Sequence, residues 1–314
     1  MLKFFRCPIV AAALLLLAPA VASAQTFPSK DVHFIVGYPP GGGPDVLTRY
    51  LADQFKTRTS RSVIVENRSG ASGGIAARFV ALSPPDGYTI LIAGGLSQTP
   101  ALFKNPPADV VKELTAVATL AQQPMLLVVS NTSSYQTLAD LTAAIKAKGA
   151  KTNYGTTFPG ARVGAALYAA KAGVPATEVQ YRGIGDLINE LGSGALDFAV
   201  VGPGAPRANL RVLAASSATR SPVLPDVPTF KESGFDIDLP GWFGAYVPAA
   251  TPQPVVDQLN AIFSEIVQTE AAAKFLAGLS YEPFALPAVK SQEFHLSDVK
   301  AWYDYARIAK IEPQ

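Results

Sequence analysis

Residues 32–55, VHFIVGYPPGGGPDVLTRYLADQF, constrain the fold of this chain more than any other stretch. They predict a buried strand, a turn of two prolines and three glycines, and an amphipathic helix. Gly41, Gly42 and Gly43 have no Cβ, so their backbone can approach a ligand closely. The first N–H groups of the helix lack intrahelical partners and lie at its positive end, which favours an anion. The stretch therefore predicts either a cup for a carboxylate or phosphate, or a tight turn that binds nothing. No Gly-Lys-Ser/Thr follows, which excludes a Walker A loop.

Strand and helix patterns alternate along the rest of the chain, which predicts α/β layers with parallel strands. Apolar runs predict strands at 62–66, 88–93, 125–129, 152–156, 196–201, 210–215 and 242–247. Amphipathic spacing predicts helices at 75–82, 138–148, 161–172, 183–191, 252–268 and 291–308.

Two units, 32–55 and 152–172, each read as strand, Gly-containing turn and helix. If each lies in its own lobe, two helix N-termini face one another across a cleft at the carboxyl ends of the strands, where α/β sheets bind ligands. A chain that leaves lobe 1 near Gln122 and returns near Trp242 has two crossover strands and a hinge for closure around a ligand.

The first 24 residues predict an export signal. Lys3 and Arg6 precede a short apolar run, and Ala22-Ser23-Ala24 forms an A-x-A cleavage site. The run is too short for an ordinary membrane span. We expect cleavage after Ala24 and a mature chain in the bacterial periplasm, with an uncleaved anchor as the alternative.

The predicted mature chain has almost no net charge and no cysteine. The full chain has 26 Lys and Arg against 24 Asp and Glu, and the leader removes two basic residues. This balance argues against nucleic acid or an anionic membrane held by bulk electrostatics. Cys7 lies in the leader, so disulfides, thiol catalysis and Cys-ligated metals are excluded from the mature chain. Only His33 and His295 remain, so we expect no metal site.

Several sequence blocks occur in the order of a known family. FPSKDVHFIVGYPPGGGPD opens the mature chain and VIVENRSGASGGIAARFVALSPPDGYTILIAG follows. Later blocks are NYG at 153–155, YRG at 181–183, RSPVLPDVPTFKESG at 220–234 and WFGAYVPAATPQPVVDQLN at 242–260. In this order they resemble the periplasmic solute receptors of tripartite tricarboxylate transporters, the Bug or TctC-type family. The resemblance implies a type II periplasmic-binding-protein fold, with two α/β lobes joined by two crossover strands. We place 25–122 and 243–314 in lobe 1 and 123–242 in lobe 2.

The resemblance implies a receptor without catalysis or cofactor. It implies a small organic carboxylate as ligand, held between turns of the two lobes and often partly through ordered water. The implied partners are the large and small membrane subunits of a transporter, and we expect a monomer. Carried over by position, the ligand-binding residues are Tyr38, Pro39, Gly42, Gly43, Asp45, Gly94, Gly95 and Ser97 in lobe 1, and Thr156, Thr157, Phe158, Arg162 and Tyr181 in lobe 2.

The chain departs from the family pattern near the expected ligand. Pro44 stands where Thr or Ser is usual, which removes a hydroxyl and an N–H. The segments 156–162 and 202–209 are short, and Arg162 lies near a position often held by His. These departures bear on the identity of the ligand more than on the fold.

Five residues carry specific hypotheses. A guanidinium at a helix start is unfavourable for the dipole, so we hypothesise that Arg162 pairs with a ligand carboxylate, with a structural ion pair as the alternative. Tyr38 and Phe158 either favour an aromatic or apolar ligand body or pack within their lobes. Asp45 either caps the first helix or attracts a ligand amine. Trp242 is expected to pack at the hinge.

The rival prediction is a secreted serine hydrolase. Residues 70–74, GASGG, match the G-x-S-x-G pattern around a nucleophile, Ser72, and His295 follows it in the order that α/β-hydrolases use. However, Ser72 comes after only the second predicted strand, and His295 lies in a helical pattern rather than on a loop. The solute receptor is therefore the favoured prediction.

Overall fold

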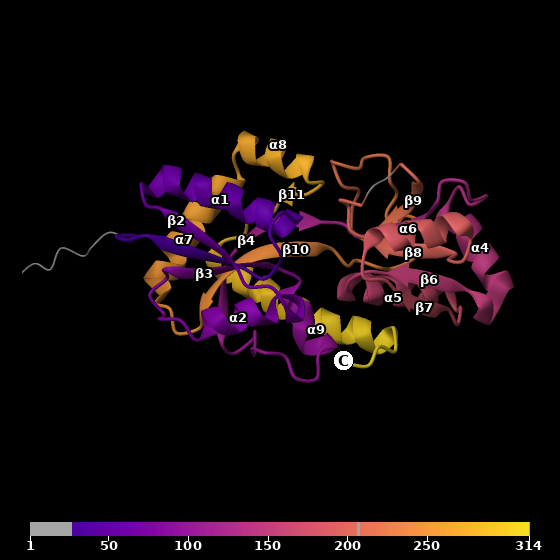
Figure 1. Cartoon of the computed structure of the whole chain (residues 1–314), viewed down its shortest axis with the longest axis horizontal. Coiled ribbons are helices and arrows are strands. Elements are labelled where there is room, and N and C mark those ends of the chain that lie inside the picture. The colour runs from indigo at the N-terminus through magenta and orange to yellow at the C-terminus, as the bar shows by residue number, and fades with distance from the viewer. Residues whose placement is uncertain (1–26, 206–207, 314) are drawn as a thin grey trace, which may run out of the picture.

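Two separate β-sheets organise the part of the chain that the computed structural model describes, residues 27–205 and 208–313. Each sheet is the centre of one lobe, and the two lobes lie side by side along the long axis of the molecule (Figure 1). The predicted leader lies outside the described residues.

The sheet of lobe 1 has six strands in the order β11-β4-β10-β3-β1-β2. Their bounds are β1 (Val32–Val36), β2 (Val63–Asn67), β3 (Thr89–Gly94), β4 (Leu114–Gln123), β10 (Gly241–Pro248) and β11 (Glu282–Pro283). β1 pairs in parallel with β2 and β3, whereas β10 runs antiparallel between β3 and β4. The prediction of parallel strands is therefore correct for β1 to β3 and wrong for β10, which enters this sheet from the other lobe.

The sheet of lobe 2 has five strands in the order β7-β6-β8-β5-β9. Their bounds are β5 (Leu126–Ser130), β6 (Asn153–Thr156), β7 (Thr177–Gln180), β8 (Phe198–Val201) and β9 (Leu210–Ala215). β6 pairs in parallel with β7 and β8, and β5 is antiparallel to β8 and β9. Without the edge strand β11, the sheet of lobe 1 reads β2-β1-β3-β10-β4 and the sheet of lobe 2 reads β7-β6-β8-β5-β9. The two sheets therefore share one order, with β10 and β5 as the antiparallel strands at equivalent positions.

Helices cover these sheets with their apolar faces. In lobe 1 they are α1 (Gly43–Thr59), α2 (Gly74–Ala81), α3 (Thr99–Leu102), α7 (Gln253–Val267) and α8 (Glu270–Gly278). In lobe 2 they are α4 (Leu138–Lys148), α5 (Pro159–Ala172) and α6 (Ile184–Ser193). Phe55 of α1 and Phe263 of α7 are fully buried against Phe34 of β1, which shows how the spacing of apolar residues in each helix builds the core.

The two lobes are joined where β4 and β10 run side by side. Gln122 is the register partner of Trp242, and Gln123 is the partner of Gly241. The chain therefore leaves lobe 1 and returns to it at neighbouring points. This is the position from which two crossover strands can act as one hinge.

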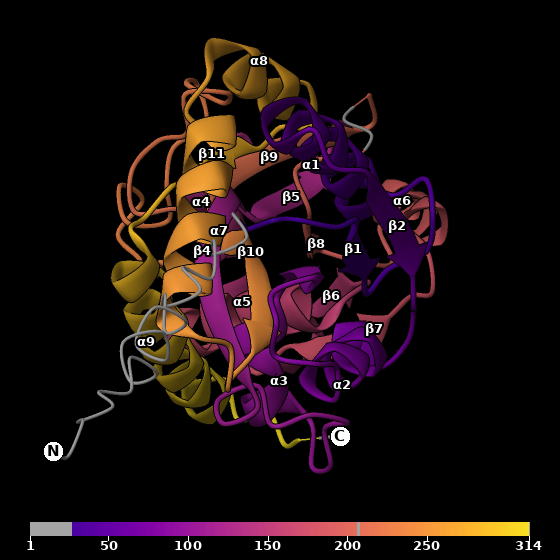
Figure 2. The same cartoon turned by 90° about the vertical axis from the view of Figure 1, so that its left-hand side faces the viewer.

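The C-terminal helix α9 (Ala288–Ile308) contacts both lobes and extends from lobe 1 toward lobe 2 in Figure 1. Figure 2, seen from the lobe 1 side, shows it at the lower left of the molecule. Near its start, Ser291 and Gln292 accept hydrogen bonds from backbone N–H groups of β4 at 3.2 and 2.7 Å. Near its end, Trp302 and Ala306 belong to the same apolar cluster as α5 of lobe 2. The range 243–314 that we placed in lobe 1 thus includes a helix end that packs against lobe 2.

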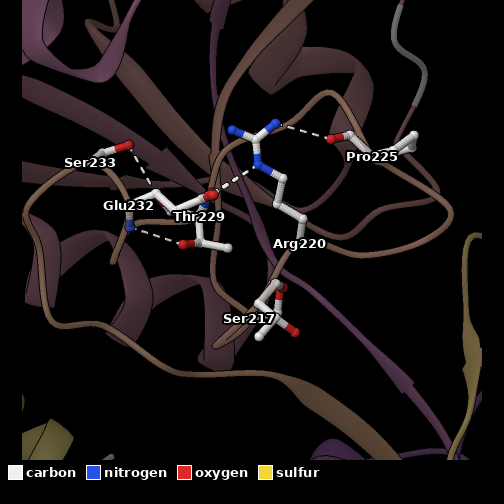
Figure 3. A network of polar contacts seen from close by, with 7 residues as sticks. Ser217, Arg220, Pro225, Thr229, Glu232 and Ser233 are labelled. Atoms are coloured by element: carbon white, nitrogen blue, oxygen red, sulfur yellow. Dashed lines mark hydrogen bonds and ion pairs between the residues drawn. The ribbon is translucent and has the colours of Figure 1, made fainter.

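The block at 220–234 forms a hydrogen-bonded turn in lobe 2, drawn in Figure 3. The Arg220 Nε donates to both carboxylate oxygens of Glu232 at 3.0 Å, and its Nη1 donates to the Pro225 carbonyl at 3.1 Å. The Thr229 hydroxyl accepts from the Glu232 N–H at 3.0 Å. These contacts close the proline-rich segment upon itself.

Candidate ligand-binding site

A cavity of about 430 Å3 lies between the two lobes. It is lined by Tyr38 and Gly94 of lobe 1, by Thr157 and Phe158 of lobe 2, and by β10 at the hinge. Its size falls in the range of small-molecule sites. The cavity is therefore the candidate ligand-binding site.

The structure brings five of the predicted site residues together around this cavity: Tyr38, Gly94, Gly95, Thr157 and Phe158. Pro44, which departs from the family pattern, also lines it. Eight other predicted residues do not line it: Pro39, Gly42, Gly43, Asp45, Ser97, Thr156, Arg162 and Tyr181. Of these, Gly43 lines a neighbouring pocket, next to Tyr281. Direct contact between a ligand and any of the thirteen residues stays a prediction.

The glycine turn of lobe 1 is held by Asp45, which is only 2% exposed. Its carboxylate accepts hydrogen bonds from the Gly41 N–H at 2.8 Å, the Asn67 amide at 2.8 Å and the Arg49 Nε at 3.0 Å. Burial opposes ionisation of Asp45, but these hydrogen bonds outweigh it and hold its pKa below the ordinary value. Asp45 therefore stabilises the turn from within, and the Gly41 N–H is already satisfied by protein.

The corresponding turn of lobe 2 is held by Glu178 of β7. One oxygen of Glu178 accepts from the Thr156 hydroxyl at 2.7 Å and the other from the Arg162 Nε at 2.9 Å. Arg162 and Glu178 are each 22% exposed. Arg162, at the start of α5, thus forms an ion pair with a protein carboxylate. A structural ion pair of this kind was the alternative to pairing with a ligand carboxylate.

The aromatic residues that line the cavity are fixed by contacts behind them. The Tyr38 hydroxyl donates to the Gly94 carbonyl at 2.8 Å, and burial raises the pKa of Tyr38 to about 12. The Phe243 ring lies 5.1 Å from the Tyr281 ring, between centroids. A Cβ on Gly94 would lie 2.7 Å from the Phe243 ring, so only glycine allows the ring to lie against β3. The rings are therefore held in place without any ligand.

Asp298 of α9 supports the same site from behind. It accepts a hydrogen bond from the Trp242 Nε1 at 2.7 Å and another from the Ser97 hydroxyl at 2.5 Å. Burial raises the pKa of Asp298, and these hydrogen bonds act in the opposite direction. Ser97 thus faces a buried carboxylate and not the cavity, whereas Trp242 is both bonded to Asp298 and exposed to the cavity.

Several lining residues were not predicted from the sequence: Gln98, Phe103, Gln123, Met125, Ile184, Phe243 and Tyr281, with residues 202–205. Gln123 and Phe243 lie on the crossover strands. Because these strands were predicted to cross between the lobes, their residues could have been predicted to line a cavity there. Tyr281 lies in a segment without a periodic pattern and reaches the cavity only through the tertiary fold.

The geometry around Ser72 and His295 does not form a hydrolase site. Ser72 lines the cavity, but His295 is fully buried and its Nε2 donates to the Val110 carbonyl at 3.2 Å. No hydrogen bond joins His295 to Ser72 among the residues that the structure describes. Burial lowers the pKa of His295 to about 4, while the Val110 contact acts against this shift. The histidine therefore serves as a neutral core residue.

No group of three or more His, Cys, Asp or Glu residues in residues 27–205 and 208–313 is arranged to hold a metal ion. None of the helices in those ranges combines the length and apolar character that crossing a membrane requires.

Comparisons with known proteins agree with this architecture. The model of the tripartite tricarboxylate transporter family receptor matches residues 47–308. A curated relative from Pseudomonas sp. strain P51, described as the UPF0065 protein in the tcbD-tcbE intergenic region, is 31% identical over 77% of this chain and 75% of its own length. The Rpa4515 protein of R. palustris with adipate superposes with a TM-score of 0.80 at 26% identity, over 92% of this chain and 100% of that one. The periplasmic binding protein BugD superposes with a TM-score of 0.76 at 25% identity, over 92% and 100%.

These matches confirm the predicted fold class of two α/β lobes joined by crossover strands. The family model covers most of the chain and includes residues 94–95 and 157–158, which line the cavity. The chain therefore belongs to the tripartite tricarboxylate transporter family of receptors.

Proposed function

We propose that this receptor binds a small organic carboxylate in the cavity between its lobes and delivers it to the large and small membrane subunits of a transporter. The observation that carries the proposal is that residues 94–95 of lobe 1 and 157–158 of lobe 2 line one cavity at the hinge. The structural neighbour Rpa4515, which was solved with adipate, supports a carboxylate as the ligand.

The proposed location is the periplasm, after removal of residues 1–24. Membership of a receptor family supports this location, as does the likeness to the periplasmic protein BugD. The same membership supports a binding protein rather than an enzyme. Hydrolysis of p-nitrophenyl acetate that disappears in Ser72→Ala would contradict this part of the proposal.

The proposed ligand contacts are Tyr38, Gly94, Gly95, Thr157 and Phe158. We assign Asp45 and Arg162 to holding their turns, because each is already paired with protein groups. Pro39, Gly42, Gly43, Ser97, Thr156 and Tyr181 do not line the cavity, and we propose no direct ligand contact for them. The proposed lobe boundaries are 25–122 with 243–314, and 123–242, in a monomer.

Transport requires that the membrane subunits distinguish an empty receptor from a loaded one. A ligand that contacts both lobes stabilises the closed form, because it makes its full set of contacts only there. The paired crossover strands β4 and β10 are the proposed hinge for this closure.

A panel of mono-, di- and tricarboxylates tests the proposal by thermal unfolding and titration calorimetry. At least one carboxylate should raise the melting temperature in a concentration-dependent way, because a ligand of the native state stabilises it. Thr157→Glu, which adds a negative charge inside the cavity, should weaken that binding at least tenfold. Light scattering of the purified mature chain checks the monomer. Absence of binding to every carboxylate at millimolar concentration would overturn the proposed function.

A further inference from the structure

Aromatic residues form much of the wall of the cavity between the lobes, which is proposed to hold an anion. Of the residues that line it, six are aromatic: Tyr38, Phe103, Phe158, Trp242, Phe243 and Tyr281. They come from lobe 1, from lobe 2 and from the hinge strand, so rings face the cavity from several sides. Aromatic walls recognise flat apolar bodies by stacking and edge-to-face contact.

These rings present a neutral surface. Burial raises the pKa of Tyr38 and of Tyr281 to about 12, so both hydroxyls stay protonated at neutral pH. Their positions are preset, by the bond from Tyr38 to the Gly94 carbonyl and by the bond from Trp242 to Asp298. A ligand that fits them gains affinity without the cost of ordering the wall.

Two half-buried amide side chains supply polar groups at this wall. Gln98 and Gln123 both line the cavity, and neither side chain has a hydrogen-bond partner within the described part of the chain. A Cβ on Gly160 would lie 3.3 Å from the Gln98 Nε2 and 3.3 Å from the Phe158 Cε2. An amide of lobe 1 and a ring of lobe 2, both of which line the cavity, therefore lie close to each other. An amide N–H donates to a carboxylate while the ring contacts the body that carries it.

From this arrangement we propose that the cavity selects an aromatic monocarboxylate, with its carboxylate at the Gln98 amide and its ring against Phe158 and Phe243. The inference rests on the proposed carboxylate-binding function and names the class of ligand for it. A linear diacid offers no flat face to these rings, and its second carboxylate loses hydration on entering a cavity that they line.

Titration calorimetry with matched acids tests this selection. The probes are benzoate and 2-naphthoate as aromatic monocarboxylates, hexanoate as a linear apolar monocarboxylate, and adipate and malate as diacids. At least one aromatic probe should bind ten times more tightly than hexanoate, adipate and malate. Equal or tighter binding of any of these three would overturn the selection while leaving the proposed function intact. Binding of no acid at all would overturn both.

Phe158→Leu tests the ring, since it keeps an apolar side chain of similar size. It should weaken binding of the aromatic probe at least tenfold and change the affinity for hexanoate less than twofold. Phe275→Leu is the matched control, because Phe275 stacks on Tyr50 at 3.9 Å and does not line the cavity. Equal losses for the aromatic and linear acids in Phe158→Leu would contradict a role for the ring.

Gln98→Glu tests the amide, because it replaces a donor by a negative charge at nearly constant size. It should weaken the aromatic probe at least tenfold, while Gln258→Glu, an exposed site on α7 with the same change in net charge, should leave the affinity within twofold. Melting curves without ligand check that each variant is folded. Unchanged affinity in a folded Gln98→Glu would overturn the assigned position of the carboxylate.

Discussion

The indole Nε1 of Trp242 donates a 2.7 Å hydrogen bond to the carboxylate of Asp298, which ties the strand that re-enters lobe 1 to the C-terminal helix. The same carboxylate accepts the Ser97 hydroxyl. One buried acid thus links the hinge strand, the turn after β3 and the helix that contacts both lobes.

Replacing Asp298 by Ala should lower the free energy of unfolding by about 2–3 kcal/mol, because it leaves the Trp242 N–H and the Ser97 hydroxyl buried without a partner. Urea denaturation measures the loss. Asp304→Ala is the control on the same helix, since Asp304 pairs with Arg307 at the exposed surface, and it should change stability by less than about 0.5 kcal/mol. Equal effects of the two variants would contradict a structural role for Asp298.

Substitutions of Arg162 and Glu178 distinguish a structural role of Arg162 from direct contact with the ligand. Arg162→Ala should lower the free energy of unfolding by about 1 kcal/mol, and Glu178→Ala by a similar amount, because each removes the same partly buried ion pair. Carboxylate affinity should stay within about twofold in Arg162→Ala, since a tenfold loss corresponds to about 1.4 kcal/mol of direct contact. A loss of affinity in Arg162→Ala that is absent from Glu178→Ala would restore the hypothesis that this arginine binds the ligand.

The stability of the protein should fall in mild acid because of His295. Its folded pKa, about 4, lies below the unfolded value of about 6.5, so the unfolded state binds more protons between these two pH values. The stabilisation by neutral His295 is complete above about pH 6.5 and is lost as the pH falls toward about 4. The full effect is on the order of 3 kcal/mol.

Thermal unfolding of the wild type and of His295→Gln at pH 7.5 and pH 5 measures this effect. His295→Gln keeps an amide that can donate to the Val110 carbonyl and has no titrating group. The wild type should lose more stability between the two pH values than the variant does. Identical pH dependence in both proteins would show that His295 is not the group responsible.

Two glycines of α5 should respond to alanine in opposite directions. Gly164 lies inside the helix, and a Cβ there would make ordinary contacts of 3.5–3.7 Å with Val200, Leu239 and Met125. Gly164→Ala should therefore raise the free energy of unfolding by about 0.5–1 kcal/mol. Gly173 ends the helix with a φ of 72°, which L-residues avoid, so Gly173→Ala should lower it by about 1 kcal/mol. Chemical denaturation of both variants checks the two signs.

The helices and strands were predictable where their signals are local. The helix at 138–148 and the strand at 210–215 have the bounds that the sequence predicts, because a capping threonine at 137 and a short apolar run mark them. The helix expected at 161–172 begins earlier, at Pro159, because proline fits the first turn of a helix. β4, β7 and α8 were missed, since their patterns are not distinct without their neighbours in the fold.

The candidate site was predictable only in part. The sequence placed Tyr38, Gly95, Thr157 and Phe158 on turns after strands, and these turns do line one cavity. It left open whether the glycine turn binds an anion or nothing, and in the structure the Gly41 N–H is bonded to Asp45. Whether a polar group is free or already satisfied depends on residues that are distant along the chain, such as Asn67 or Glu178, and no local pattern shows this.

The sequence alone determined the two α/β lobes, the family and some of the turns that line the cavity, because periodicity, glycine turns and ordered blocks are properties of short stretches. The tertiary structure decided which side chains make the wall of the cavity. Gln123, Trp242 and Tyr281 meet there only because β4 and β10 pair side by side and the segment after α8 returns to them. Such contacts join residues far apart in the chain, and their geometry exists only once both lobes have packed.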